Sequence, residues 1–402
     1  MERTAGRLGT TAVDGVPAGR VERPTSTTEV SALLRETAAA KETLVPCGAR
    51  TKLTWGLPPD SADVLLDLSA LRGVVEHQAG DLIVTARAGT PLREVQECVA
   101  ATGQRLLVDE TLPGATVGGT LATHASGPHR LVGGTMRDLL IGVTLVRADG
   151  VVAKAGGKVV KNVAGYDVGK LLVGSYGTLA VVTECTFRLH PVPAARRWLT
   201  ARVGSAEEAQ ELTRAVVHAQ VVPAAVEIAL DPAGDGALSV LLEGRPDGVA
   251  GRAGVVRELW GGPAESGDAP EGWGAYPWDP SVTGEDRAVA LKLAFRLSGL
   301  RDVLTEARGL RIRGSAGAGV LYAALGVEAG RGSHEEVAAT VERLRGVCAH
   351  HHGSLVVLDA PGSLKPALDM WGPVPALGLM QRVKDEFDPD HRLSPGRFVG
   401  GI

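Results

Sequence analysis

Cysteine is scarce in this sequence, and its four copies stand far apart, at Cys47, Cys98, Cys185 and Cys348. Zinc ribbons and iron–sulfur clusters need thiolates at short spacings such as C-x-x-C. The chain therefore carries neither kind of centre by itself. We expect its thiols to be reduced, as is usual in the cytoplasm.

Long apolar runs and dense basic runs are also missing. No run approaches the roughly 18 apolar residues of a membrane-spanning helix, and the opening MERTAGRLGT lacks the apolar centre of a signal peptide. The net charge is −4, without a Lys/Arg cluster that could follow phosphates. These absences predict a cytoplasmic protein with no transmembrane segment and no nucleic-acid partner.

Three common site motifs do not occur. GAGVLY places Tyr322 where a dinucleotide-binding G-x-G-x-x-G would have its third glycine, and VGSYG has Val173 at the first position of a G-x-S-x-G elbow. There is no Walker A sequence either. A Rossmann dehydrogenase, a P-loop enzyme and an α/β-hydrolase are all disfavoured.

Glycine, in contrast, is plentiful, with 53 copies, and three glycine-bearing stretches are candidates for one site. VPCGARTK (45–52) follows a strand. It reads either as a nest of backbone N–H groups that binds anionic oxygens, with charge from Arg50 and Lys52, or as an ordinary surface turn. LPGATVGGTLATHASG (112–127) reads either as backbone that approaches a ligand closely or as a tightly packed loop. The third stretch (158–180) precedes a period-two strand beginning at Val181.

Past residue 193 the pattern changes to strand, helix, strand, strand, helix over 197–260, and a second set follows over 288–360. Ser205 and Glu208 form a capping box at the first of these helices, as Ser26 and Glu29 do near the N-terminus. Two such sets predict one largely antiparallel sheet covered by helices. A long Gly/Pro loop (261–284) separates them.

Six blocks taken together resemble a known family: VPCGARTKL, LPGATVGGTLA, GGTMRDLLIGVTLVRADG, KVVKNVAGYD, GSYGTLAVVTE and the tail FDPDHRLSPGR. They are similar to FAD-linked oxidases of the vanillyl-alcohol oxidase/PCMH type, and most similar to the FAD-binding E subunits of bacterial glycolate oxidases. The resemblance spans about 24–192 and the final twenty residues. It implies an α+β fold: a PCMH-type FAD-binding domain of two α+β subdomains and a central antiparallel-sheet substrate or cap domain. The expected boundaries are 1–23 (N-terminal extension), 24–192 (FAD domain), 193–360 (central domain) and 361–402 (segment returning to the FAD domain).

The resemblance also implies where FAD binds. The pyrophosphate is expected against the first glycine turn, the second loop lines the flavin, and the strand at Val181–Thr183 runs beside the isoalloxazine ring. The residues expected at the cofactor are Pro46, Gly48, Ala49, Arg50, Thr51, Lys52, Pro113, Gly114, Thr116, Gly118, Gly119, Ser126, Gly127, Arg137, Asp138, Asn162, Gly165, Asp167, Gly177 and Val182. Asp167 is expected to cap a short helix, and the Arg137–Asp138 pair reads equally as local structure.

Departures from the family pattern lead to further predictions. The first turn lacks the His that tethers flavin in some members, so FAD is expected to be non-covalent, and Ser394 replaces the usual Asn of the tail. No closely spaced His ligands occur, so no metal site is expected; HHHG (350–353) suits a helix end. His124 has a structural role or touches substrate or flavin. Trp273, Tyr276 and Trp278 line a cleft or partner surface, or anchor their loop.

The implied activity is oxidation of a small 2-hydroxy acid, glycolate to glyoxylate, by hydride transfer to FAD. The implied partners are a second flavoprotein subunit and an iron–sulfur subunit, through which the cytoplasmic chain would contact the inner membrane. Two alternatives remain: a self-sufficient FAD-dependent 2-hydroxy-acid dehydrogenase and a non-catalytic flavoprotein scaffold. No catalytic base is identified from sequence.

Overall fold

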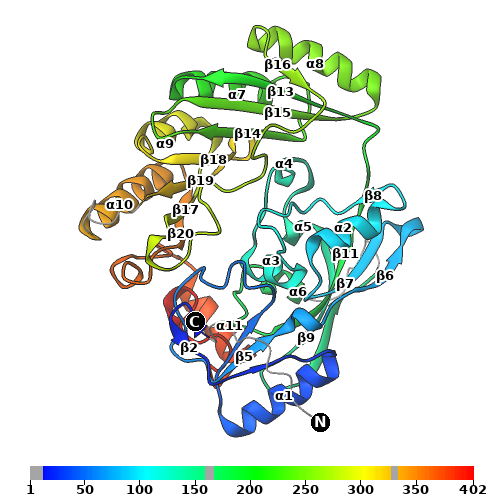
Figure 1. Cartoon of the computed structure of the whole chain (residues 1–402), viewed down its shortest axis with the longest axis vertical. Coiled ribbons are helices and arrows are strands. Elements are labelled where there is room, and N and C mark those ends of the chain that lie inside the picture. The colour runs from blue at the N-terminus through cyan, green and yellow to red at the C-terminus, as the bar shows by residue number, and fades with distance from the viewer. Residues whose placement is uncertain (1–11, 159–166, 327–333) are drawn as a thin grey trace.

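Three sheets organise the fold, which we describe from a computed structural model covering residues 12–158, 167–326 and 334–402. A three-stranded and a five-stranded sheet come from the first half of the chain, and an eight-stranded sheet comes from the second (Figure 1). The fold class expected from sequence, α+β with a large antiparallel sheet after the FAD-binding half, is confirmed.

The smallest of the three sheets is parallel and holds the first glycine turn. Its order is β3 (Arg20–Glu22), β5 (Val64–Asp67), β4 (Leu44–Cys47), with helix α1 (Thr27–Ala40) between β3 and β4 and a hairpin of β1 (Ala12–Val13) and β2 (Val16–Pro17) before it. The predicted cap of α1 forms, since Ser26 Oγ accepts from Glu29 N at 3.2 Å. The Glu29 carboxylate accepts from Thr25 N, one residue before the cap, instead of from Ser26 N.

The five-stranded sheet is antiparallel, in the order β10 (Val152–Gly156), β9 (Leu140–Val146), β11 (Val181–Arg188), β7 (Ile83–Arg87), β6 (Val74–Gln78). A tight turn at Asp149-Gly150 joins β9 and β10, with Gly150 at φ +78°. Helix α2 (Leu92–Ala100) begins directly after Pro91, which stands at its N-cap position. Short helices carry the glycine loops: α3 (Val117–Thr123), α4 (Arg130–Gly133), α5 (Met136–Leu139) and α6 (Val168–Leu172).

The eight-stranded sheet is antiparallel at every neighbouring pair, as predicted. Its order is β16 (Ala264–Ser266), β13 (Ala195–Val203), β15 (Gly236–Gly244), β14 (Ala225–Leu230), β18 (Arg311–Ser315), β19 (Val320–Leu325), β17 (Val289–Ala294), β20 (Ser354–Asp359). Sequence reasoning missed β16 and β18. RIRGS of β18 is short, charged and glycine-bearing, and it is a strand because β14 and β19 pair with both of its edges.

The two faces of this sheet differ in chemistry. Apolar side chains such as Leu199, Ile228 and Leu291 pack under α7 (Ala206–His218), α8 (Pro246–Trp260), α9 (Leu300–Glu306) and α10 (His334–His350). The opposite face carries a cross-strand row of polar residues, joined by register through four strands: Thr200, Ser239, Glu227 and Ser315. Because side chains alternate along a strand, these residues all point toward the first half of the chain.

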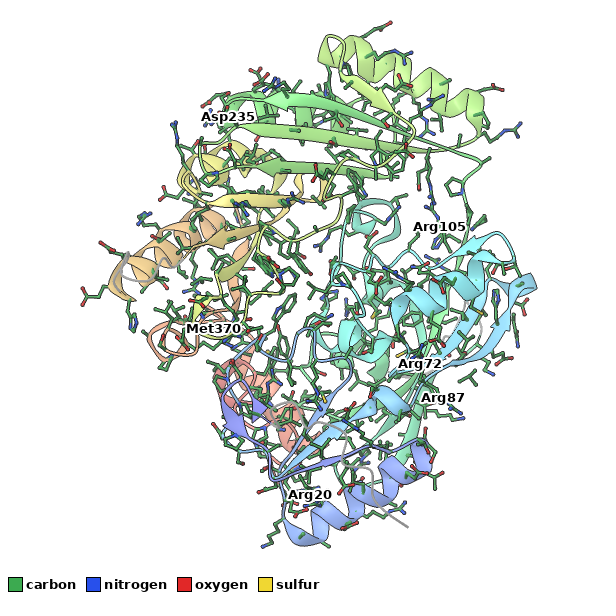
Figure 2. All side chains as sticks on the ribbon, in the orientation of Figure 1. Arg20, Arg72, Arg87, Arg105, Asp235 and Met370 are labelled. Carbon is green, nitrogen blue, oxygen red and sulfur yellow. The ribbon has the colours of Figure 1, made fainter. Side chains whose placement is uncertain are left out.

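Contacts between the halves are polar as well as apolar. Arg105, labelled in Figure 2, extends from the short pair β8 (Gln104–Arg105) and β12 (His190–Pro191) to Glu243 of β15, with Nη–Oε distances of 2.7 and 2.6 Å. Helix α11 (Leu377–Phe387) and the tail return to the first half, where Leu44 N donates to Arg392 O and Ser394 N donates to Leu44 O, both at 2.8 Å.

Short 3₁₀ segments complete the described chain: η1 (Leu68–Ala70), η2 (Ala79–Asp81), η3 (Gly284–Asp286), η4 (Leu297–Gly299), η5 (Ala316–Ala318), η6 (Lys365–Ala367) and η7 (Val399–Gly401).

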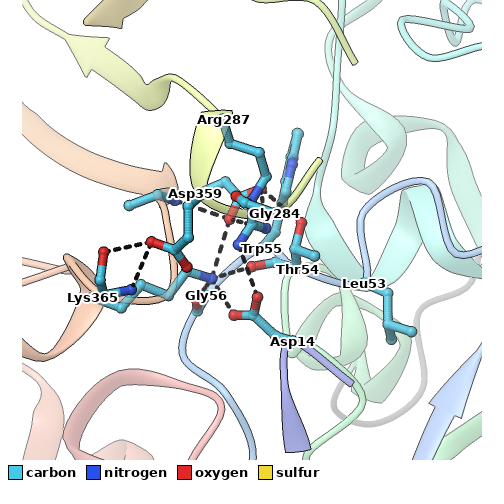
Figure 3. Close-up of polar contacts among 12 residues, drawn as sticks. Asp14, Leu53, Thr54, Trp55, Gly56, Gly284, Arg287, Asp359 and Lys365 are labelled. Atoms are coloured by element: carbon cyan, nitrogen blue, oxygen red, sulfur yellow. Dashed lines mark hydrogen bonds and ion pairs between the residues drawn. The ribbon is translucent and has the colours of Figure 1, made fainter. Parts of the chain in front are cut away.

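A buried ion network, which we call the Lys365 cluster, joins four distant segments (Figure 3). It consists of Asp14, Arg287, Asp359, Lys365 and the neighbouring Thr54. Lys365 Nζ lies 2.5 Å from Asp14 Oδ2 and 3.1 Å from Asp359 Oδ1. Arg287 contacts the same two carboxylates at 3.1 and 3.0 Å. The two positive charges of the cluster equal its two negative charges. Thr54 Oγ1 donates to Asp359 Oδ2 at 2.6 Å, which fixes the loop after the first glycine turn to the cluster.

Candidate functional site

Two of the three predicted glycine stretches, together with the described part of the third, meet around one groove in the first half. The first turn lies against the start of α3, and the segment after α6 lies against the first turn. The groove is lined by small and apolar residues: Pro46, Cys47, Gly48, Leu68, Ala88, Thr116, Gly118, Gly119, Leu121, Ala122, Leu172, Ser175, Tyr176, Gly177, Ala180 and Val182. It continues into a second hollow lined by 49–53, Thr123 and Arg397. Sequence reasoning thus brought the correct loops together.

The first turn is built as an anion nest. Within the described chain, the backbone N–H groups of the four consecutive residues 49–52 donate no hydrogen bond. Arg50 adopts a left-handed conformation with φ +62°, which helps to turn successive N–H groups toward one side. Unbonded N–H groups need partners, and anionic oxygens on a ligand would supply them.

The two predicted cations of this turn differ. Arg50 is paired, with Nη2 3.3 Å from Asp67 Oδ2. Lys52 is 6% exposed and contacts only a hydroxyl, Thr51 Oγ1, at 3.4 Å. Burial lowers the pKa of Lys52 to about 8. Lys52 is therefore the cation without a counter-ion beside the nest, where a diphosphate would neutralise it.

The glycines of the groove serve loop packing. A Cβ on Gly48 would lie 2.3 Å from Thr116 Oγ1, and one on Gly118 would lie 2.8 Å from Ala88 Cβ. Gly177 has φ +74°, and its Cβ would lie 2.7 Å from Pro46 Cγ. The tight-packing reading of the second stretch is supported by these distances, and the ligand-wall reading stays a prediction that is compatible with it.

The tail closes one side of the groove and contributes residues that sequence reasoning missed. Arg397 Nη2 donates to Leu53 O and Trp55 O at 2.6 and 2.8 Å, which fixes the loop after the nest. Tyr176 stacks on Phe398 at a centroid distance of 5.4 Å. Ser394 is fully buried, and its Oγ has no partner in the described chain. Proximity of the tail to β4 could not be read from local sequence.

Several predicted cofactor residues lie elsewhere. Pro113 and Gly114 are exposed in the turn before α3. Asp138 caps α5, accepting from Thr135 N at 2.7 Å, and Arg137 is exposed, so the pair has the local role considered for it. Asp167 stands at the cap position of α6, but its side chain makes no capping hydrogen bond. Asn162 and Gly165 lie outside the described residues.

Ser126 and Gly127 face a second pocket, between the halves, which we call the interface pocket. Its first-half wall is Thr111, 126–128 and Arg130, and its second-half wall is the polar face of the large sheet together with the loop 270–276. The loop aromatics have both expected roles. Tyr276 stacks on Trp278 at 4.5 Å, accepts from Thr111 Oγ1 at 3.1 Å, and lines the pocket.

The histidines considered from sequence are engaged in local contacts. His124 ends α3 with φ +51°, and its Nε2 lies 2.9 Å from Thr135 Oγ1. Burial, and then the charge of Lys292, lower the pKa of His124 to about 4, so its ring is neutral at pH 7. His351 of HHHG lies 3.0 Å from Asp302 Oδ2. In the described ranges, no three His, Cys, Asp or Glu side chains are grouped to hold a metal ion.

Comparison with known proteins identifies the class. The FAD binding domain family matches residues 18–156, and the family of FAD linked oxidases, C-terminal domain, matches residues 321–398. The two matches follow in chain order and cover both the nest and the returning tail. The chain belongs to the FAD-linked oxidases of the PCMH/vanillyl-alcohol oxidase type.

Individual relatives are similar over part of their length. Glycolate oxidase subunit GlcE of Escherichia coli K12 is 34% identical over 56% of this chain and 62% of its own. Glycolate oxidase subunit GlcD of Bacillus subtilis is 30% identical over 52% and 45%, and D-lactate dehydrogenase of Archaeoglobus fulgidus is 36% identical over 42% and 38%. The matched region thus spans less than two thirds of each relative.

The fold is shared more widely. A solved structure of alkyldihydroxyacetonephosphate synthase superimposes with a TM-score of 0.67 over 94% of this chain and 76% of its own, at 14% identity. At that identity the likeness concerns the fold alone. Among the helices of the described ranges, none combines the length and apolarity required to cross a bilayer.

Proposed function

We propose that the chain is the FAD-binding subunit of a glycolate oxidase-like complex that oxidises a 2-hydroxy acid, glycolate to glyoxylate. The observation that carries the proposal is the coincidence of the nest and groove with the matched FAD family, in a chain whose relatives include glycolate oxidase subunits and D-lactate dehydrogenases. A second flavoprotein subunit and an iron–sulfur subunit are the proposed partners, and the complex is placed in the cytoplasm.

The residues of the groove fit FAD. The N–H groups of 49–52 and the Lys52 ammonium suit a diphosphate, and the small residues of the second stretch leave a flat apolar wall beside Val182. Bound FAD supplies a hydride acceptor. The chain's own contribution is to orient the cofactor and to shield it from water. Attachment is proposed to be non-covalent, since burial raises the pKa of the nearby Cys47 thiol to about 12 and keeps it unreactive.

The test combines a spectrum with anaerobic titration. Purified chain loaded with FAD should show flavin absorbance, and acid precipitation should leave all the yellow colour in the supernatant. Glycolate or D-lactate added without oxygen should then bleach the flavin, alone or after partner subunits are added. Colourless protein that ignores added FAD contradicts the cofactor. Flavin that precipitates with the chain contradicts non-covalent attachment.

The competing functions separate in the same assay. Rapid bleaching by the isolated chain indicates a self-sufficient 2-hydroxy-acid dehydrogenase. Stable FAD binding with no reduction by any 2-hydroxy acid, with or without partners, indicates a scaffold.

A further inference from the structure

The interface pocket contains an arginine without a partner. In the part of the chain that the structure describes, the Arg130 side chain makes no ion pair or hydrogen bond, and its Nη1 is fully buried. The pocket's other arginine, Arg313, is engaged, donating from Nη1 to Gly272 O at 2.7 Å. The residue as a whole is half-buried, and a cation whose terminal nitrogen is buried without a counter-ion is unfavourable. Arg130 is therefore prepared for an anion that arrives from outside the chain.

A second cation strengthens the positive field at this interface. Lys292 of β17 lies beside Tyr322 in the strand register, on the sheet face that forms the pocket wall. No hydrogen bond or ion pair satisfies it within the described ranges. Burial, and then the charge of Arg130, lower the pKa of Lys292 to about 8. Two neighbouring cations that repel each other attract an anion more strongly than one.

Uncharged polar groups of the same pocket also lack partners. Ser126 Oγ and Ser315 Oγ belong to residues that are 5% and 2% exposed, and neither oxygen has a hydrogen-bond partner in the described chain. Glu227 Oε1 is likewise buried without a partner in hydrogen-bond geometry. Ser315 stands directly across from it in the register, and its hydroxyl lowers the pKa of Glu227 against the larger effect of burial. Native proteins rarely leave this many buried polar atoms unsatisfied in one place. Their number and spread match a small ligand that carries several oxygens.

We propose that the interface pocket binds the carboxylate and hydroxyl of a small 2-hydroxy acid. Arg130 pairs with the carboxylate, and Glu227, Ser315 and Ser126 hold the remaining oxygens. The identity of the acid rests on the proposed function. The pocket and the unpaired Arg130 are observed in the structure and do not depend on the proposed function.

Glu227 makes the binding dependent on pH. Burial raises the pKa of Glu227 to about 8, so that at neutral pH its carboxyl group is protonated and donates to an anionic oxygen. Above that pH it ionises and repels the ligand, and affinity falls. The charged and titratable groups that face Glu227 or line its pocket are Asp109, His129, Arg130, Glu271, Tyr276, Arg313 and Tyr322. They are unchanged in a Glu227 variant, so the comparison isolates Glu227.

The experiment is calorimetric titration of FAD-loaded chain with glycolate, D-lactate and oxalate, the last of which has no hydrogen on carbon to be oxidised. Arg130→Met should raise the dissociation constant roughly 10- to 100-fold, the usual effect of losing a hydrogen bond to a charged group. Arg130→Lys, which retains the charge and volume for folding, should give a smaller rise. Arg308→Met, at an exposed site beyond α9 on the helix side of the sheet, should leave binding unchanged.

Glu227→Gln provides the second measurement, because an amide donates at every pH. At pH 7 it should bind oxalate about as the parent does, and at pH 9 roughly tenfold more tightly than the parent. Equal affinity of Arg130→Met and parent, or no binding of any of the three acids by the parent, overturns the proposal. Arg130-dependent binding without flavin reduction, either by the chain alone or with partner subunits added, would support the pocket and contradict the proposed function instead. Flavin reduction by a 2-hydroxy acid that is equally fast in parent and Arg130→Met would support the proposed function and contradict the proposed role of the pocket.

Discussion

Gly48 and Lys52 stand four positions apart in one turn and contribute to the groove in different ways. Gly48 is a steric requirement, because Thr116 occupies the space where its side chain would lie. Lys52 is an electrostatic requirement, because its buried ammonium forms no ion pair with any described residue and Glu110 acts on it only through its longer-range charge. One residue sets the shape of the site and the other sets its charge.

Gly48→Ala should lower FAD occupancy. The added Cβ would lie 2.3 Å from Thr116 Oγ1, so that the first turn or the start of α3 must move and the groove changes shape. The measurement is the flavin-to-protein absorbance ratio after loading and desalting. Gly248→Ala in α8, where a Cβ meets nothing within 4 Å, is the control. Equal ratios in both variants would remove Gly48 from the site.

Lys52→Met should weaken FAD binding, and should do so most at neutral pH. The pKa of Lys52 is about 8 without ligand, so its charge is present below that pH and is lost above it. In the parent, FAD affinity should therefore fall as pH rises through 8, by up to about tenfold per unit. Fluorescence titration of the apoprotein with FAD from pH 6.5 to about 9.5 measures both effects.

Lys154→Met, at an exposed position of β10, is the matched control. A parallel pH profile in Lys52→Met and parent would show that another group is responsible.

The Lys365 cluster has a structural task that no single element could perform. It ties the N-terminal hairpin, the loop after the first glycine turn, the segment before β17 and η6 to one another (Figure 3). Removing one member of a buried ion network leaves the others uncompensated, which is far more damaging than losing an exposed pair.

Lys365→Met should lower the free energy of unfolding by about 3–5 kcal/mol, because Asp14 and Asp359 would then share one cation, Arg287. Lys170→Met breaks an ion pair on α6 with both partners at least one-third exposed, and should change stability by less than about 1 kcal/mol. Urea denaturation of the two apoproteins, followed by tryptophan fluorescence, makes the comparison. Similar midpoints for both variants would refute the structural role of the cluster.

Across the whole chain, the proposed FAD groove belongs mainly to the first half and the polar pocket wall belongs largely to the second, so that the proposed activity would need both. The domain boundaries at 23, 192 and 360 stay a prediction. Of the two carboxylates that line the described pocket, Glu227 is kept protonated at neutral pH by burial, and Glu271 is exposed on the loop 270–276, so neither is a buried, ionised base. The four dispersed cysteines cannot hold a cluster that takes electrons onward.

We therefore expect the isolated chain to oxidise glycolate or D-lactate slowly, since general-base help contributes roughly two to four orders of magnitude. The measurement is turnover with FAD, a dye acceptor and a panel of 2-hydroxy acids, with and without partner subunits. Rates of roughly 1–1000 per second from the chain alone would show a complete dehydrogenase.

Local rules were enough for much of this protein. Period-two alternation predicted β11, and Ser26 and Ser205 predicted helix starts. The glycine turn after β4 allowed two readings, an anion nest and an ordinary surface turn. Each of these features depends on residues within a few positions of one another. The family resemblance added the convergence of the glycine loops on FAD.

The tertiary structure decided the rest, because the remaining features depend on residues far apart in sequence. Glu227 is a pocket residue only because β14 pairs with β18 in a register that places it opposite Ser315. Arg130 is unpaired only because α4 lies against that face of the sheet. Conversely, Asp138 follows a glycine loop but is occupied as a helix cap. Burial and pairing are properties of the packed chain, and the same side chains in local sequence are indistinguishable from ordinary surface charges.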